Sequence, residues 1–166
     1  MFALKIVGTV CITGATTLYA RGLVNELSCR IAALKAIKQS FTTLKGELRY
    51  GVETLPSAFM HVGERCSCGQ ETVRDFFWNT GNRLKTENGS ILKEVWEEEA
   101  KKLAAAACLN GNECDNLIAV ADSLGYLDLT QQTNNIELYL QSVDESIEAL
   151  SGKYEQNSRM YMSLGV

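Results

Sequence analysis

The fold is decided by the stretch Gly46-Glu47-Leu48-Arg49-Tyr50-Gly51-Val52-Glu53-Thr54-Leu55-Pro56, which separates one long helical pattern from several shorter ones. It holds the only proline of the 166-residue chain. Gly51 can take the left-handed conformation that ends a helix without a Cβ penalty. Pro56 has no amide proton to donate, so it suits the first turn of a new helix, with Thr54 as a candidate cap. The stretch therefore predicts that a long helix stops here and that the chain turns back.

Two apolar stripes with helical spacing lie on either side of this turn, one upstream and one near the C-terminus. Their steps of three and four residues are typical of long helices with a coiled-coil-like seam. The upstream stripe consists of Leu23, Leu27, Ile31, Leu34, Ile37, Phe41, Leu44 and Leu48. The downstream stripe consists of Ile136, Leu140, Val143, Ile147, Leu150, Tyr154 and Tyr161. We expect two long antiparallel helices that pack through knobs-into-holes contacts.

Shorter helices are expected between the two long ones. Their predicted ranges are residues 56–65, 71–84, 91–109 and 113–124, and the last long helix is expected to start near Asp128. Ser90 is the expected cap of the third of these, Asn110-Gly111-Asn112 its end, and Gly125 the stop of the fourth. No segment alternates convincingly as a strand would. The fold class predicted is all-α, with about six helices in an antiparallel bundle and two long helices bracketing the shorter ones.

Aromatic and acidic residues of the central helices have simple structural interpretations. Phe76, Phe77, Trp78 and Trp96 are predicted to be core or interface aromatics. The run Glu97–Glu99 is predicted to be a solvated helix face, since charge runs on helices are usually exposed.

The first twenty residues have three possible interpretations. Phe2 to Ala20 carries one charge, Lys5, and about 20 apolar residues suffice to cross a bilayer once. The segment can be a membrane anchor, a cleaved signal peptide ending in the small residue Ala20, or a buried core helix. No turn signal separates it from the helix after Arg21, which favours an uncleaved helix. We predict an N-terminal membrane anchor over residues 1–20 and a helical domain over residues 21–166.

Charge asymmetry predicts the orientation of this domain. Residues 21–50 hold six basic and two acidic residues, although the whole chain has a net charge of −4. An excess of Lys and Arg directly after a membrane span is typical of the cytoplasmic side. The bulk of the chain is therefore expected in the cytoplasm. The mild net charge gives no indication of nucleic-acid binding.

The cysteines and the single histidine do not form a recognised catalytic or metal-binding pattern. Cys66, Cys68, Cys108 and Cys114 are the clustered cysteines, with one and five residues within the pairs, which fits a zinc site poorly. A disulfide would need an oxidising compartment, so free thiols are the preferred interpretation, with any metal or redox role left open. His61, the only histidine, has no nucleophile or acid partner in a catalytic spacing. We expect no enzyme activity, no cofactor, no metal and no small-molecule substrate.

Three groups of residues carry a resemblance to a known family. They are Leu44-x-x-Glu47-Leu48-Arg49-Tyr50-Gly51-x-x-x-Leu55-Pro56-x-Ala58; Ser123-Leu124-Gly125-x-x-Asp128 followed by Gln132 and Ile136-x-Leu138; and Asn157-x-x-Met160-x-x-Ser163-Leu164-Gly165. In this order and spacing the chain resembles the stage III sporulation protein AB family of endospore-forming bacteria, over essentially its whole length.

The resemblance implies a fold, a location and partners. The helical domain would be like the cytoplasmic domain of type II secretion system F platform proteins, which lie in the inner membrane beneath a secretion or pilus machine and connect to a hexameric motor ATPase. The location would be the mother-cell membrane around the forespore (the outer forespore membrane). The motor would be stage III sporulation protein AA, acting with other subunits of a channel between mother cell and forespore. Family members continue past the Ser163-Leu164-Gly165 motif into a second apolar membrane segment, which the 166 residues do not include.

Two functional hypotheses follow. The leading one is a non-enzymatic, membrane-anchored scaffold that docks the motor ATPase, with Glu47, Arg49, Tyr50 and Gly51 as candidate contacts; these four residues can also serve only to end a helix. The alternative is a secreted small helical protein with cysteine cross-links after signal cleavage. Cleavage after Ala20 would leave five cysteines, an odd number, and this argues against the alternative.

Overall fold

The computed structural model describes the backbone of residues 2–50, 54–66, 69–87, 89–125 and 128–163, and the side chains within these ranges except those of residues 2–21, 23–24 and 157–163. The described residues form six helices and no strand. These helices are α1 (Phe2–Tyr50), α2 (Leu55–Glu64), α3 (Glu71–Thr86), α4 (Leu92–Ala106), α5 (Gly111–Leu124) and α6 (Leu129–Ser163). The predicted all-α class, with long first and last helices bracketing four shorter ones, is confirmed.

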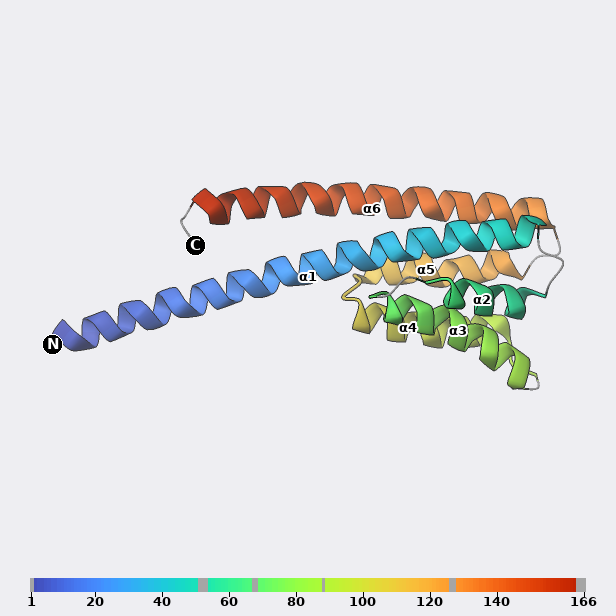
Figure 1. Cartoon of the computed structure of the whole chain (residues 1–166), viewed down its shortest axis with the longest axis horizontal. Coiled ribbons are helices and arrows are strands. Elements are labelled where there is room, and N and C mark those ends of the chain that lie inside the picture. Colours follow the sequence, from blue (N-terminus) through green and yellow to red (C-terminus); the bar gives the residue numbers. More distant parts are fainter. Residues whose placement is uncertain (1, 51–53, 67–68, 88, 126–127, 164–166) are drawn as a thin grey trace.

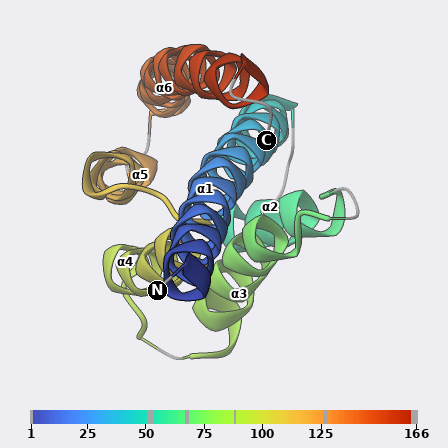
Figure 2. The same ribbon diagram turned by 90° about the vertical axis from the view of Figure 1, so that its left-hand side faces the viewer.

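Helix α1 is the central element of the bundle. Viewed end-on, α6 lies above it and α2 to α5 are arranged around its other sides (Figure 2). Helix α6 runs in the opposite direction along the C-terminal half of α1, while the N-terminal part of α1 extends beyond the shorter helices (Figure 1). The bundle therefore forms around the second half of one long helix.

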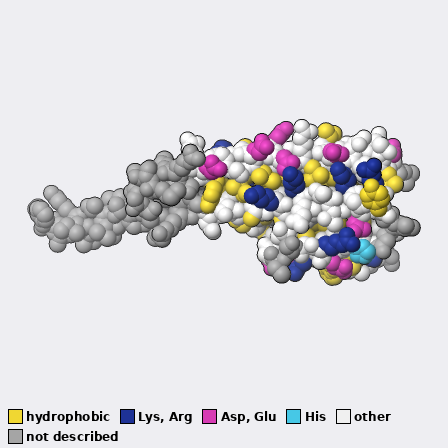
Figure 3. Space-filling view, turned by 45° about the horizontal axis from the view of Figure 1, so that its top comes forward, with side chains coloured by type: hydrophobic (Ala, Val, Ile, Leu, Met, Phe, Trp, Pro, Cys, Tyr) yellow, Lys and Arg dark blue, Asp and Glu magenta, His cyan; other side chains and the backbone are white. Residues whose placement is uncertain are grey.

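The two predicted stripes meet where α1 and α6 pack against each other. Leu34, Ile37, Phe41 and Leu44 of α1 are buried, as are Ile136, Val143 and Leu150 of α6. Lys and Arg side chains lie close to Asp and Glu side chains on the face shown in Figure 3. Two ion pairs join α1 to α6: Lys38 lies 2.6 Å from Asp144, and Lys45 lies 3.5 Å from Glu137. Because exposed ion pairs add only about 0–1 kcal/mol each, burial of the apolar stripes holds the helices together.

An aromatic cluster forms the centre of the core. Phe41 of α1 lies 5.4 Å from Phe77 and 4.8 Å from Tyr139 of α6, measured between ring centroids. Trp96 of α4 lies 4.7 Å from Phe76 and 5.3 Å from Phe59 of α2. The indole N–H of Trp96 donates a 2.8 Å hydrogen bond to the carbonyl oxygen of Leu117 on α5. Phe76, Phe77 and Trp96 are thus core residues as predicted, whereas Trp78 is 40% exposed.

The chain turns back after α1 as the opening stretch predicts. Pro56 lies in the first turn of α2, and Thr54 occupies the N-cap position. The Thr54 side chain makes no capping hydrogen bond and lies 3.3 Å from the hydroxyl of Ser57 instead. The prediction that Gly51 ends the helix falls outside the described residues.

The boundaries of α4 and α5 differ from the prediction. Helix α4 has Ile91 at its N-cap, not Ser90, and it ends at Ala106, before the predicted Asn110-Gly111-Asn112. Cys108 follows with a φ of 55°, so a non-glycine residue makes the left-handed turn. Asn110 begins α5 instead of ending α4, because its side chain accepts a hydrogen bond from the Glu113 amide in a capping box. Gly125 follows the last residue of α5 as predicted, with an ordinary φ of −78°.

Glu99 is an exception to the predicted solvated acidic face. Its side chain is 3% exposed and accepts hydrogen bonds from Arg83 at 3.1 Å and from Lys102 at 2.6 Å. The prediction was wrong for Glu99, because the charge run alone does not show that α3 places Arg83 beside this residue.

Among the described residues, no helix combines the length and the apolar composition needed to cross a membrane. The side chains of the predicted anchor, residues 1–20, lie outside the described part.

Candidate functional site

The last turn of α1 carries the exposed part of the predicted docking site. Tyr50 is 80% exposed, more than any other large hydrophobic side chain among the described residues. The guanidinium carbon of Arg49, also an exposed residue, lies 5.8 Å from the centroid of the Tyr50 ring. This distance suits a cation–π contact, which holds the two side chains together at the surface.

Glu47 has an internal partner. Its side chain is 19% exposed, and one carboxylate oxygen accepts a 2.5 Å hydrogen bond from Arg65, the residue that caps the end of α2. The pair joins the last turns of α1 to the C-terminal end of α2. The structure therefore places Tyr50 and Arg49 outward and Glu47 in a contact within the chain; Gly51 lies outside the described residues.

More apolar surface is exposed where α6 begins. Leu129, its first residue, is 53% exposed. The end of α1 and the start of α6 lie at the same end of the molecule (Figure 1). This end therefore offers a partner an aromatic ring, a guanidinium group and an aliphatic side chain.

The candidate chemistry of the cysteines and the histidine is limited in the described part. Cys29, Cys66, Cys108 and Cys114 are free thiols, and Cys68 lies outside that part. The Cys66 sulfur lies 3.4 Å from the Ser40 hydroxyl and 3.5 Å from the Val62 carbonyl oxygen, so it is packed between α1 and α2. Within the same residues, no group of three or more His, Cys, Asp or Glu side chains can hold a metal ion.

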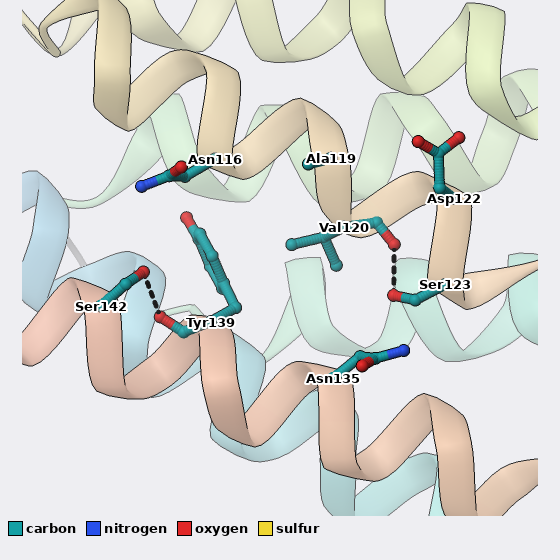
Figure 4. Close-up of a pocket in the computed structure, with 8 residues that line it drawn as sticks. All are labelled: Asn116, Ala119, Val120, Asp122, Ser123, Asn135, Tyr139 and Ser142. Atoms are coloured by element: carbon teal, nitrogen blue, oxygen red, sulfur yellow. Dashed lines mark hydrogen bonds between the residues drawn. The ribbon is translucent and has the colours of Figure 1, made fainter.

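A groove lies between α5 and α6, and it was not predicted from the sequence (Figure 4). Its volume is about 400 Å³, and it is lined by Asn116, Ala119, Val120, Asp122, Ser123, Asn135, Tyr139 and Ser142. The Tyr139 hydroxyl points across it toward α5 near Asn116, while the Ser123 and Ser142 hydroxyls turn back to carbonyl oxygens of their own helices (Figure 4). The groove could not be predicted from the sequence, because Tyr139 looks like one more apolar residue beside Leu140.

Comparisons with known proteins identify the family. Residues 5–166 match the family model described as stage III sporulation protein AB. The chain belongs to the stage III sporulation protein AB family. The resemblance inferred from the three motifs is thereby confirmed.

Two similar proteins agree with this assignment. Stage III sporulation protein AB of Bacillus subtilis (strain 168) is 25% identical over 162 residues, which is 98% of this chain and 92% of that protein. A solved structure of a stage III sporulation protein AB superposes with a TM-score of 0.67 at 20% identity, covering 76% of this chain and 97% of the solved chain. The superposition shows that the two chains share a fold, and the family places this chain in sporulation.

Proposed function

We propose that this chain is a non-enzymatic scaffold subunit of a secretion-like channel between mother cell and forespore. It docks the motor ATPase, stage III sporulation protein AA, and other subunits of the same complex from the mother-cell membrane. Membership of the family supports the sporulation role. The observation that carries the docking role is the exposed Tyr50, held against Arg49 at the end of the long helix.

The chemistry of this end suits protein recognition. Tyr and Arg are enriched among the residues that dominate binding energies, since each combines a large contact area with hydrogen-bonding capacity. Tyr50 also sits on a helix whose preceding turns are fixed by the buried Leu44 and by the Glu47–Arg65 pair. Little conformational entropy would therefore be lost when a partner binds there.

The position along α1 supports the same proposal. A helix rises about 1.5 Å per residue, so Tyr50 lies about 45 Å from Ala20 along the helix axis. With the proposed anchor over residues 1–20 in the membrane, the docking end would stand well clear of the lipid surface. A peripheral ATPase in the cytoplasm would meet this end first.

Two surface lysines with a raised pKa owe the shift to ion pairs with carboxylates. A hydrogen bond from Lys93 to Asp122 raises the pKa of the Lys93 ammonium group. A hydrogen bond from Lys101 to Glu97 raises the pKa of Lys101 in the same way. Such pairs are structural, and for this reason we propose a binding role, not a catalytic one.

Tyr50→Ala and Arg49→Glu test the docking role directly. We expect each to reduce co-purification of the AA ATPase by about tenfold or more, as truncation of a binding hot spot does. Leu138→Ala is the matched control, since Leu138 is 64% exposed but lies more than two turns after the start of α6. Circular dichroism should show unchanged helical content in all three variants. If both Tyr50→Ala and Arg49→Glu co-purify as much of the ATPase as the wild-type protein does, this end of α1 is not the docking site.

A further inference from the structure

Asn110 and Gly111, where α5 begins, form a pair with an intrinsic chemical weakness. In an Asn-Gly sequence the backbone nitrogen of the glycine can attack Cγ of the asparagine, because glycine has no side chain to hinder the approach. A second such pair, Asn88-Gly89, lies partly outside the described residues. Asn110 and Gly111 are both exposed, and a Cβ atom at Gly111 would meet nothing within 4 Å. Water and the attacking nitrogen are therefore both available at this position.

The backbone conformation of Asn110 holds the two reacting atoms apart. The attack closes a flat five-membered ring, so the Gly111 nitrogen has to eclipse Cβ of Asn110 about the Cα–C bond. Asn110 instead has a φ of −79° and a ψ of 170°, the extended conformation of an N-cap residue. At this ψ the nitrogen is staggered relative to Cβ. Ring closure therefore requires a rotation about the Cα–C bond that destroys the N-cap conformation.

Three hydrogen bonds resist that rotation. The side-chain oxygen of Asn110 accepts a 2.7 Å bond from the Glu113 amide, and the Asn110 amide donates a 3.0 Å bond to the Glu113 carboxylate. These are the two halves of the capping box. The carbonyl oxygen of Asn110 also accepts a 3.0 Å bond from the Cys114 amide, at the start of α5. The reacting side chain and its own backbone are thus both tied down.

The capping box is itself held by α1. Arg30 donates two 2.8 Å hydrogen bonds to the Glu113 carboxylate, one to each oxygen. The Glu113 side chain is 7% exposed and that of Arg30 is 19% exposed, so water screens this pair little. The conformation of Asn110 therefore depends on a contact with a residue 83 positions away in the sequence.

We propose that Asn110 is a latent deamidation site, which the capping box closes as long as Arg30 holds Glu113. When the start of α5 opens, the Gly111 nitrogen forms a bond to Cγ of Asn110. The bond from Cγ to the side-chain nitrogen breaks, and this nitrogen leaves as ammonia together with the proton lost from the Gly111 amide. One water molecule then adds to either ring carbonyl and opens the ring, which yields aspartate or isoaspartate.

The two products have different consequences for α5. Aspartate at position 110 can still cap the helix, because a carboxylate accepts the same hydrogen bond. Isoaspartate lengthens the main chain by one carbon and shortens the side group by one, so neither half of the capping box can form again. The isoaspartate form therefore loses the local tie between the start of α5 and α1 permanently. This reaction is independent of the docking role proposed for Tyr50.

Incubation of the purified full-length protein in mildly alkaline buffer tests the proposal. Tandem mass spectrometry of the peptide that contains Asn110 measures the deamidation rate, and enzymatic methylation detects isoaspartate. We expect the folded wild type to react at least about tenfold more slowly than the same chain unfolded in urea, since the reaction needs local opening. Glu113→Ala, folded by circular dichroism, should react about tenfold faster than the folded wild type, the shift expected from loss of hydrogen bonds to a charged group.

Three further variants separate opening of the cap from general loss of stability. Glu113→Gln keeps a side-chain oxygen for the Asn110 amide and should give an intermediate rate. Asp122→Ala breaks the exposed pair with Lys93 near the other end of α5 and should leave the rate unchanged. Gly81→Ala, which strains the packing of α2 against α3, should also leave it unchanged. Equal rates in the folded and urea-unfolded wild type would overturn the proposal without any variant. It would also fail if Gly81→Ala accelerated the reaction as much as Glu113→Ala, or if folded Glu113→Ala reacted no faster than wild type.

Discussion

At the scale of single residues, Glu113 connects helix formation to tertiary structure. Its carboxylate accepts hydrogen bonds from Arg30 of α1 at 2.8 Å through each oxygen and from the Asn110 amide at 3.0 Å. The side chain is 7% exposed, so these three bonds compensate the charge that folding removes from water. One residue thus closes the capping box of α5 and ties the start of that helix to α1.

Tyr139 makes stability sensitive to alkaline pH. Its pKa is raised by burial, whereas a tyrosine in the unfolded chain ionises near pH 10. Above about pH 10 the unfolded state therefore binds fewer protons than the folded state, and the free energy of unfolding falls as the pH rises. Each group of this kind contributes a slope of up to about 1.4 kcal/mol per pH unit.

We therefore expect Tyr139→Phe to flatten the decline of stability between pH 10 and 11. Urea denaturation at a series of pH values measures the slope, and ultraviolet absorbance follows tyrosine ionisation in the same samples. Identical slopes for the two proteins would show that Tyr139 ionises equally readily in the folded and unfolded states.

At the scale of elements, Gly81 of α3 permits the close packing of α2 against α3. A Cβ atom at Gly81 would lie 2.5 Å from the carbonyl oxygen of Pro56 and 2.7 Å from Cγ of Met60. Because the first of these contacts is with backbone, a side chain at this position would force the two helices apart. At Gly152 in α6, by contrast, a Cβ atom would meet nothing within 4 Å.

Two alanine substitutions should accordingly have opposite effects on the free energy of unfolding. Gly81→Ala is expected to lower the free energy of unfolding by about 2 kcal/mol, the usual size of an overpacking penalty. Gly152→Ala should raise it by about 0.5–1 kcal/mol, because alanine favours helix and meets no obstacle. Chemical denaturation of both variants measures the difference. If the Gly81→Ala protein were as stable as the wild type, α2 and α3 could move apart without loss of stability, and the prediction would be wrong.

At the scale of the whole molecule, the aromatic cluster joins nearly every helix. Phe41 contacts rings from α3, α4 and α6, and Trp96 contacts rings from α1, α2 and α3 and bonds to α5. No helix of the described bundle has a separate core. We infer that the six helices unfold together as one cooperative unit.

Phe41→Ala tests this cooperativity. Removing a fully buried phenylalanine should cost about 3–5 kcal/mol, and the midpoint should shift equally by circular dichroism and by tryptophan fluorescence. Leu138→Ala, at a site that is 64% exposed, should change stability by less than about 0.5 kcal/mol. Two separate transitions in the Phe41→Ala protein would instead indicate that α6 unfolds independently of the shorter helices.

Much of this architecture is encoded locally. Steps of three and four between apolar residues suffice to predict α1 and α6, since a helix repeats every 3.6 residues whatever it packs against. The start of α2 at Pro56 and the end of α5 before Gly125 were also predictable, since proline suits the first turn of a helix and glycine commonly follows the last one. Family membership was also readable from three short motifs in the right order.

Other features depend on which elements meet in space, and only the tertiary structure decided them. Glu99 is buried because α3 brings Arg83 beside it, and Glu113 because α1 brings Arg30. The end of one helix and the start of the next within residues 46–56 were predictable from the sequence. The internal Glu47–Arg65 pair and the outward position of Tyr50 were not. Likewise the groove at Tyr139 exists only because α5 and α6 lie side by side. Helical periodicity identifies the face of a helix that is buried, but it does not specify which side chains from distant segments will face each other there.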